Sequence, residues 1–344
     1  MKSPTTTNFF LELAARGMRA PIGTELVLSE KPDPGAIKLD GLGLGQVIEE
    51  AARRWKTPLA LPLMDLTVEK EWLLGSLGIA AGKIPTWHFD GGIPESLPDA
   101  PPTPRLRANL EAIRHIATAT DLFACGMSIG PFSLMTKLIA DPISPVFLAG
   151  LGEVDEDVER VENTLALATE VILHTIGAQL DAGAKAVVLC EPAANAVYFS
   201  PKQLADGADT FERYVMALNR RIADYLNERG AALIFHDCGE LTNSMVEQFS
   251  TLEPAMMSLG SSRVLWEDAG LVPDHIVLYG NLPTKKFYSD EVMPLAQVQE
   301  AGRELLEKMT ATGHPFILGS ECDVLSVPGA ERTIREKVNA FLNL

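Results

Sequence analysis

Ala231-Ala232-Leu233-Ile234-Phe235-His236 is an apolar run that ends in a histidine, and Asp237-Cys238-Gly239 follows it directly. The run has the length and the aliphatic character of a buried strand. Residues two apart on a strand point to the same side, so His236 and Cys238 are expected to share a face. Imidazole and thiolate are ligands that zinc prefers. The segment therefore predicts a strand that carries two metal ligands at its carboxyl end.

A second segment repeats this arrangement near the end of the chain. The run 315–320 is apolar, and Glu321-Cys322-Asp323 comes after it. A catalytic zinc needs three protein ligands and one open position, which predicts a zinc site made of His236, Cys238 and Cys322. Asp237 and Glu321 alternate with these ligands and are expected to face away from the metal. The fold must bring Cys322 back to the other two residues.

Strand-like runs alternate with helical patterns along nearly the whole chain, which is typical of α/β proteins. Eight such units in 344 residues predict a (β/α)8 TIM barrel. We interpret residues 1–344 as one barrel domain with an N-terminal helical extension and an inserted Pro-rich loop near 88–106. The expected strands are 20–24, 58–64, 121–128, 185–191, 231–236, 254–259, 275–280 and 315–320, and the clearest helices are 155–181, 210–229, 294–311 and 330–342.

The active site of such a barrel lies at the carboxyl ends of its strands. Besides the three ligands, four polar residues follow expected strands there. Glu191 is a candidate catalytic residue, as a fourth zinc ligand, a general base or the partner that orients His236. Asp65 either contacts the substrate or caps the following helix. Ser128 and Asn281 are candidate cofactor-binding residues.

Composition limits the possible partners. The chain is 47% hydrophobic and 22% charged, with a net charge of −17, so nucleic acid and anionic membrane surfaces are not expected partners. No apolar stretch reaches the length of a membrane span, and the N-terminus lacks a signal peptide's apolar core, so a cytoplasmic location is expected. In that reducing compartment, Cys238 and Cys322 are expected to bind metal rather than form a disulfide.

The remaining candidate motifs are interpreted as structural. Cys125 and Cys190 lie in strand-like runs without a neighbouring ligand and are expected to be buried thiols. The other five histidines have no ligand spacing. Gly41-Leu42-Gly43-Leu44-Gly45 superficially matches a nucleotide-binding loop, but no convincing strand precedes it.

Three segments carry a resemblance to a known family. They are Met64-Asp65-Leu66-Thr67-Val68-Glu69, Gly130-Pro131-Phe132-Ser133-Leu134, and His236-Asp237-Cys238-Gly239 together with Cys322. With them the chain resembles the uroporphyrinogen decarboxylase superfamily and, within it, the cobalamin-dependent methyltransferase branch that includes methylcobalamin:coenzyme M methyltransferases. The Gly-Pro-Phe-Ser motif is shared by the superfamily. The His-x-Cys motif with a distant cysteine is the zinc signature of the methyltransferases.

This resemblance implies a zinc-dependent methyltransferase. His236, Cys238 and Cys322 would hold Zn2+, and a methyl group would move between a methylcorrinoid on a small partner protein and a thiol or another small acceptor. Because no segment reads as a cobalamin-binding domain, the corrinoid is expected to come from that partner.

Three alternatives stay open. A corrinoid-linked demethylase would act on a methyl ether, amine or thioether at the same site. A decarboxylase like the family's namesake would need its two-arginine motif, and in the matching region 15–21 only Arg19 remains in place. A noncatalytic zinc scaffold would have four protein ligands, and its zinc coordination would not change on adding a thiol.

Overall fold

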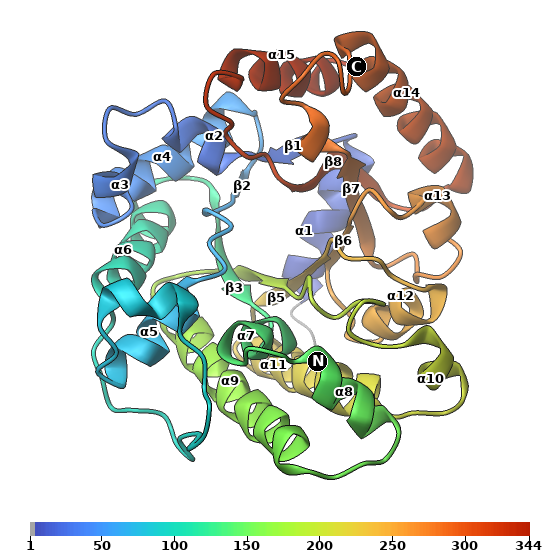
Figure 1. The fold of residues 1–344 in the computed structure, drawn as a ribbon. Helices are drawn as coiled ribbons and strands as arrows, with labels where there is room; N and C mark the ends of the chain where they lie inside the picture. The colour runs from blue at the N-terminus through green and yellow to red at the C-terminus, as the bar shows by residue number, and fades with distance from the viewer. Residues whose placement is uncertain (1–3) are drawn as a thin grey trace.

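Eight parallel strands and their helices form a barrel in the computed structural model, which describes residues 4–344 (Figure 1). The strand order is β1-β8-β7-β6-β5-β4-β3-β2, and every neighbouring pair is parallel. Between β1 and β2, at the two ends of this order, the Thr24 hydroxyl donates a 2.6 Å hydrogen bond to the carbonyl of Leu61. The structure confirms the predicted (β/α)8 barrel.

All eight predicted strands are present, with shifted ends. Their bounds are β1 (Arg19–Ile22), β2 (Leu59–Ala60), β3 (Phe123–Ile129), β4 (Ala186–Cys190), β5 (Ala232–Asp237), β6 (Met256–Leu259), β7 (Val277–Leu282) and β8 (Phe316–Asp323). The predicted strand 58–64 is wrong in length, since only two of its residues pair with β3. The prediction for β8 was too short, so Cys322 lies inside that strand.

Helices surround the strands, and short helices also form parts of the connections between them. None of the helices within residues 4–344 is both long and apolar enough to cross a bilayer. The helices are α1 (Pro4–Ala15), α2 (Thr24–Leu28), α3 (Pro34–Ile37), α4 (Gly41–Arg54), α5 (Val68–Ser76), η1 (Ala81–Thr86), α6 (Pro104–Ala119), α7 (Pro131–Leu138), α8 (Ile143–Gly150), α9 (Glu156–Asp181), α10 (Pro201–Ala205), η2 (Glu212–Met216), α11 (Ala217–Glu228), α12 (Asn243–Ser250), α13 (Leu265–Asp268), η3 (Thr284–Lys286), α14 (Leu295–Thr312) and α15 (Glu331–Leu342).

The glycine-rich segment 41–45 forms the first turns of α4 rather than a loop. Asp40 begins the helix, and its carboxylate accepts a hydrogen bond from the amide of Leu42 at 3.2 Å. A Cβ atom on Gly45 would lie 2.9 Å from the imidazole of His115 on α6. The glycine therefore serves close packing between two helices, in agreement with the exclusion of a nucleotide loop.

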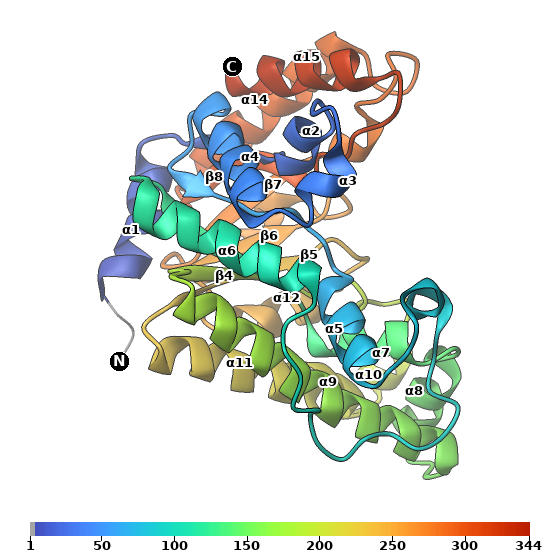
Figure 2. The same cartoon turned by 90° about the vertical axis from the view of Figure 1, so that its left-hand side faces the viewer.

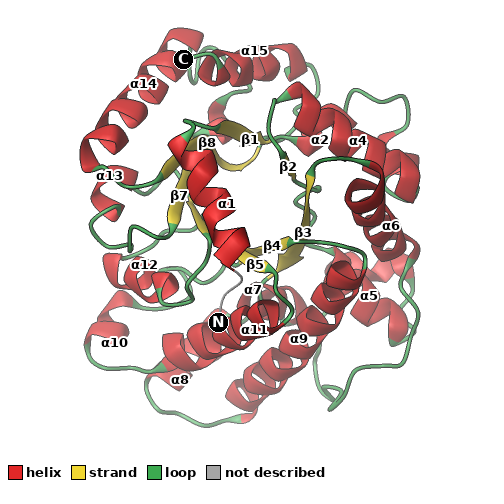
Figure 3. Ribbon diagram, turned by 180° about the vertical axis from the view of Figure 1, so that it is seen from behind, coloured by secondary structure: helices red, strands yellow, loops and turns green. Residues whose placement is uncertain are grey.

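One end of the barrel is covered by the N-terminal helix (Figure 3). On α1, Phe10 and Leu13 are buried among side chains from the barrel interior. The ring of Phe9 stacks on Phe123, the first residue of β3, at a centroid distance of 4.4 Å. Because Phe123 marks the amino end of its strand, α1 covers the amino ends of the barrel. The carboxyl ends, where His236 and Cys322 lie, face the opposite way.

Candidate metal centre

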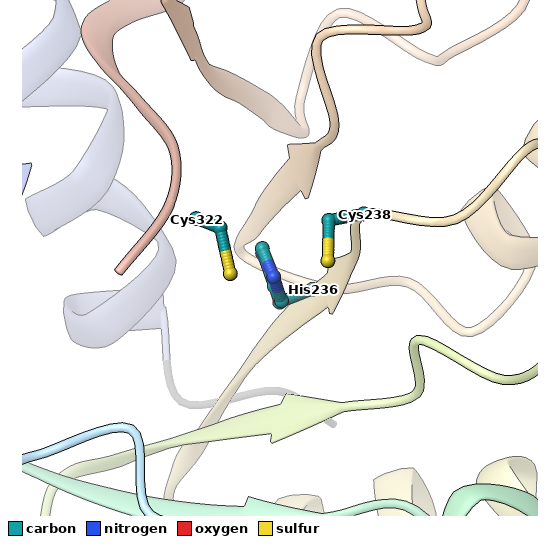
Figure 4. A group of neighbouring side chains, drawn as sticks. All are labelled: His236, Cys238 and Cys322. Carbon is teal, nitrogen blue, oxygen red and sulfur yellow. The ribbon is translucent and has the colours of Figure 1, made fainter. Parts of the chain in front are cut away.

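The three predicted ligands converge at the carboxyl ends of β5 and β8. The nitrogen and sulfur atoms that His236, Cys238 and Cys322 offer all lie within 4.8 Å of one another. Figure 4 shows the two sulfur atoms and the imidazole directed at the same small space. His236 is buried, whereas the two cysteines remain partly accessible. The barrel thus brings Cys322 back to the His-x-Cys pair.

A serine on the adjacent strand holds the imidazole. Ser258 on β6 pairs in register with His236, and its Oγ lies 2.9 Å from Nδ1 of the imidazole. The other ring nitrogen, Nε2, is buried and has no hydrogen-bond partner within residues 4–344. An unpartnered buried nitrogen is costly unless something binds it. This nitrogen, with its neighbour fixed by a hydrogen bond, fits a metal ligand.

The two thiols interact with each other and with nearby cations. The hydrogen bond between them, with the nearby imidazole of His236 and ammonium of Lys285, lowers the pKa of Cys238 and favours its thiolate. The same hydrogen bond and burial raise the pKa of Cys322. A thiolate is the form that binds metal. One imidazole and two cysteine sulfurs are a donor set suited to zinc.

Lys285, on η3 just after β7, is a residue that the sequence analysis missed. Partial burial opposes its charge, but negative charge on Cys238, Cys322 and Glu321 more than offsets that effect and raises the pKa of Lys285. Glu321 connects the loops that follow β6 and β7, because its carboxylate accepts hydrogen bonds from the Ser261 hydroxyl at 2.6 Å and from the Lys285 amide at 3.2 Å. Glu321 supports the loops around the centre and, as predicted, is not among the clustered ligands.

The centre is partly accessible, because the side chains of Cys238 and Cys322 are only half-buried. Within residues 4–344, no further His, Cys, Asp or Glu joins the three clustered ligands. The thioether of Met64 lies 3.6 Å from the sulfur of Cys322 and covers one flank. Three clustered donor groups, two of them on half-buried thiols, match the number of protein ligands that a catalytic zinc site requires.

Glu191 stabilises the start of α7. Its buried carboxylate accepts hydrogen bonds from the amides of Phe132 at 3.3 Å and Ser133 at 2.6 Å, and from the Asn219 amide group at 3.1 Å. Gly130 precedes the helix without a side chain to cap it, and a Cβ atom there would lie 2.2 Å from the Glu191 carboxylate. The Gly-Pro-Phe-Ser motif thus begins a helix whose first amides are bound by Glu191, the residue that follows β4.

The roles considered for Glu191 can be compared with this geometry. Burial raises the pKa of its carboxyl group despite these hydrogen bonds. Ser258, rather than Glu191, is the hydrogen-bond partner of the His236 side chain. Glu191 is also absent from the group of clustered ligands. The contacts of Glu191 are those of a residue that holds a helix in place.

Asp65 lies between β2 and α5 and accepts hydrogen bonds in the turn that leads into α5. Its carboxylate accepts a 2.8 Å hydrogen bond from the Thr67 hydroxyl and forms an ion pair with Arg105. These contacts belong to the turn before α5 rather than to a helix cap, because the N-cap residue of α5 is Thr67.

The two candidate cofactor-binding residues make internal hydrogen bonds. Both amide hydrogens of Asn281 are donated to carbonyls of the β6–α13 connection, to Gly260 at 2.8 Å and to Arg263 at 2.9 Å. The Ser128 hydroxyl donates to Oε1 of the buried Glu69 at 2.7 Å. The other carboxylate oxygen, Oε2, has no hydrogen-bond partner within residues 4–344.

We expect Glu69 to make stability depend on pH. Burial raises its pKa from 4.5 to about 7, even though the Ser128 hydrogen bond acts in the opposite direction. The fold therefore favours the protonated acid, and its stabilising effect is complete below about pH 4.5 and disappears as pH rises through about 7, for a total of about 3 kcal/mol. Glu69→Gln should be more stable than the wild type at pH 8 and similar at pH 4.5, as measured by urea unfolding. The exposed Glu228→Gln is the control, and equal pH profiles of wild type and Glu69→Gln would contradict the expectation.

Arg19 does not occupy the position expected from the arginine motif. It is the first residue of β1 and pairs in register with Leu318, four residues before Cys322 on β8. Its guanidinium donates a 3.3 Å hydrogen bond to the carbonyl of Leu342 near the end of α15. At a rise of about 3.3 Å per residue, Arg19 lies roughly one strand length from the metal centre, at the covered end of the barrel. Because β1 begins at this arginine, the side chain that matched the motif lies away from the clustered ligands.

Comparison with known proteins agrees with this architecture. The family model described as uroporphyrinogen decarboxylase (URO-D) matches residues 51–341. No curated protein matches the chain. Among solved structures, a methyltransferase from Methanosarcina mazei is similar, with a TM-score of 0.70, 17% identity and 98% of each chain covered. A protein described as a vitamin-B12-independent methionine synthase from Listeria monocytogenes has a TM-score of 0.48 and 16% identity, with 87% of this chain and 85% of that chain covered.

Proposed function

The chain belongs to the uroporphyrinogen decarboxylase family, and on that basis we propose that it is a zinc-dependent methyltransferase that takes its methyl group from a methylcorrinoid on a partner protein. A thiol or another small molecule is the acceptor. The observation that carries the proposal is the cluster of His236, Cys238 and Cys322, in which both thiols are half-buried. A fold shared with a methyltransferase is compatible with this function.

The chain's own residues prepare the site for this chemistry. Ser258 fixes the imidazole of His236 so that Nε2 is free to bind the metal. Cys238 and Cys322 supply sulfur ligands, and the positive charge of Lys285 offsets part of their negative charge. Zinc bound there would lower the pKa of a substrate thiol and keep it as a thiolate near neutral pH.

The electrons and bonds of the proposed methyl transfer balance without an added oxidant or reductant. A lone pair of the substrate thiolate would form the new S–CH3 bond, and the corrinoid would leave with the electron pair of the broken Co–C bond. The thiol proton is released to solvent. The corrinoid protein would approach over the carboxyl ends of the strands, because α1 covers the other end of the barrel (Figure 3).

Decarboxylation of a substrate with many carboxylates fits the molecule less well. Arg19, the one arginine that matched the decarboxylase motif, lies at the covered end of the barrel. The net charge of −17 also disfavours a polyanionic substrate. Decarboxylation would also leave the cluster of His236, Cys238 and Cys322 without a role.

The first test of the proposal is metal analysis followed by a methyl-transfer assay. We expect about one zinc per chain, as for a single site with these ligands. When the protein is given methylcobalamin and a small thiol, we expect cob(I)alamin to form, which is measured by its absorbance. Methylation of cob(I)alamin by a methyl ether, amine or thioether would instead identify the demethylase direction. A protein that takes up no zinc after metal addition would rule out both, and a zinc site whose coordination does not respond to thiols would point to the noncatalytic scaffold.

A further inference from the structure

A cavity of about 560 Å³ lies apart from the metal centre, between α5, η1 and the segment that leads to α6. Figure 2 shows α5 and α7 at the edge of the molecule, with the long connection to α6 running beside them. None of the metal-centre residues lines the cavity. Its volume is within the range of about 300–1,000 Å³ that is usual for small-molecule sites. One wall is apolar and includes Ile79, Ile84 and Pro85.

Two lysines at this cavity have no acidic partner. Lys70 on α5 is only 5% exposed, and its ammonium donates hydrogen bonds to the carbonyls of Pro85 at 3.3 Å and Lys137 at 2.7 Å. Neither Lys70 nor Lys137 forms an ion pair with an acidic residue within residues 4–344. Burial lowers the pKa of Lys70, and the nearby charge of Lys137 lowers it further. Two buried or half-buried cations that repel each other are destabilising unless an anion joins them.

The acidic residues near the cavity already have a cation of their own. Arg105 forms ion pairs with both Asp65 and Glu71, the latter at 2.8 Å. The side chain of His88 also lines the cavity, and its pKa is lowered by partial burial and by the charge of Lys70. Uncompensated positive charge is notable in a chain that carries 46 acidic and 29 basic residues, because partners of opposite charge are plentiful. The lining of the cavity therefore combines apolar side chains with a surplus of positive charge.

We propose that this cavity binds a small organic acid, with its anionic group at Lys70 and Lys137 and its apolar body against Ile79 and Ile84. An anion there would offset the repulsion between the two ammonium groups and use the remaining hydrogen-bonding capacity of Lys70. The apolar wall excludes a fully polar anion such as inorganic phosphate as the best ligand, since that wall would stay without a contact. Carboxylate, phosphate and sulfonate groups share the required charge. The inference does not depend on the metal centre.

Calorimetric titration of the full chain can test this site with a matched set of probes. The set is octanoate, octyl phosphate and octanesulfonate, with octanol as the neutral control of equal chain length and inorganic phosphate as the control without an apolar body. We expect at least one of the three acids to bind at least about tenfold more tightly than octanol or phosphate, and the order among the acids identifies the preferred anionic group. Added salt should weaken the binding.

Variants then connect the binding to the two lysines. Lys137→Gln and Lys70→Met should each weaken the preferred acid by about tenfold or more, as loss of a charged contact predicts. Lys83→Gln is the matched control, because Lys83 is exposed on η1 and does not line the cavity. Lys70 is buried, so thermal unfolding must first show that Lys70→Met is folded, and the half-buried Lys137 gives an independent variant. The proposal is overturned if none of the acids binds at millimolar concentration, if octanol binds as well as they do, or if both lysine variants bind like the wild type.

Discussion

Cys238→Ser is expected to remove the metal and, with it, the methyl-transfer activity. A serine hydroxyl does not ionise near neutral pH and is not a soft ligand, so only His236 and Cys322 would remain of the three clustered ligands. Zinc content should fall from about one per chain to nearly none, and methylation of a thiol by methylcobalamin should fall by more than the roughly 10- to 100-fold that loss of a residue supporting a ligand costs. Elemental analysis and the cob(I)alamin assay measure the two effects.

Matched variants separate this effect from general damage. His236→Ala and Cys322→Ser should behave like Cys238→Ser. Cys125→Ser places the same substitution in a buried strand outside the cluster, where the hydroxyl can take over the contact of the thiol with the carbonyl of Phe123, and it should keep its zinc. Ser258→Ala leaves all three ligands but removes the hydrogen bond to Nδ1 of His236, so zinc affinity should fall by about 10- to 100-fold. Normal zinc content in Cys238→Ser would contradict the proposed site.

Glu191→Ala is expected to have the second largest effect, on stability. It would leave the amides of Phe132 and Ser133 and the side-chain amide of Asn219 without their acceptor in a buried place. Each unpartnered buried group costs about 1–3 kcal/mol, and water entering the space left by the side chain would recover part of this. We expect the free energy of unfolding to fall by roughly 3–5 kcal/mol in urea titration.

The conservative variant distinguishes a structural from a catalytic role for Glu191. Glu191→Gln keeps one carbonyl acceptor for the amide of Ser133 and places its NH2 group near the donors of Phe132 and Asn219, so it should lose less stability than Glu191→Ala, with zinc content and methyl transfer retained. The exposed Glu228→Ala should change stability by no more than about 0.5 kcal/mol. If Glu191→Gln is folded but has no zinc or no activity, Glu191 takes part in metal binding or in the reaction, and the structural role is contradicted.

The strands and much of the metal centre could be predicted because their signals are local. Each apolar run carries its own preference for a buried strand, and His236 and Cys238 share a face because the strand repeats every two residues. Cys322 was placed correctly once eight units implied a barrel, since the carboxyl ends of parallel strands meet at one end. The strand ends were less certain, as β2 shows, because they depend on pairing with a neighbour rather than on the run itself.

The barrel, the family resemblance and the three clustered candidate ligands follow from residue types and their spacing along the chain. The residues that support these ligands can be identified only in the folded protein. Ser258 faces His236 through the register of two strands, and Glu191 meets α7 across a connection, so neither partnership leaves a mark in the spacing of residues. Arg19 matched the arginine motif in sequence only, and its distance from the clustered ligands appears only in the folded chain. The unpaired charges of Lys70 and Lys137 appear only when the distances to all acidic residues are known, since electrostatic energy depends on separation in space and not along the chain.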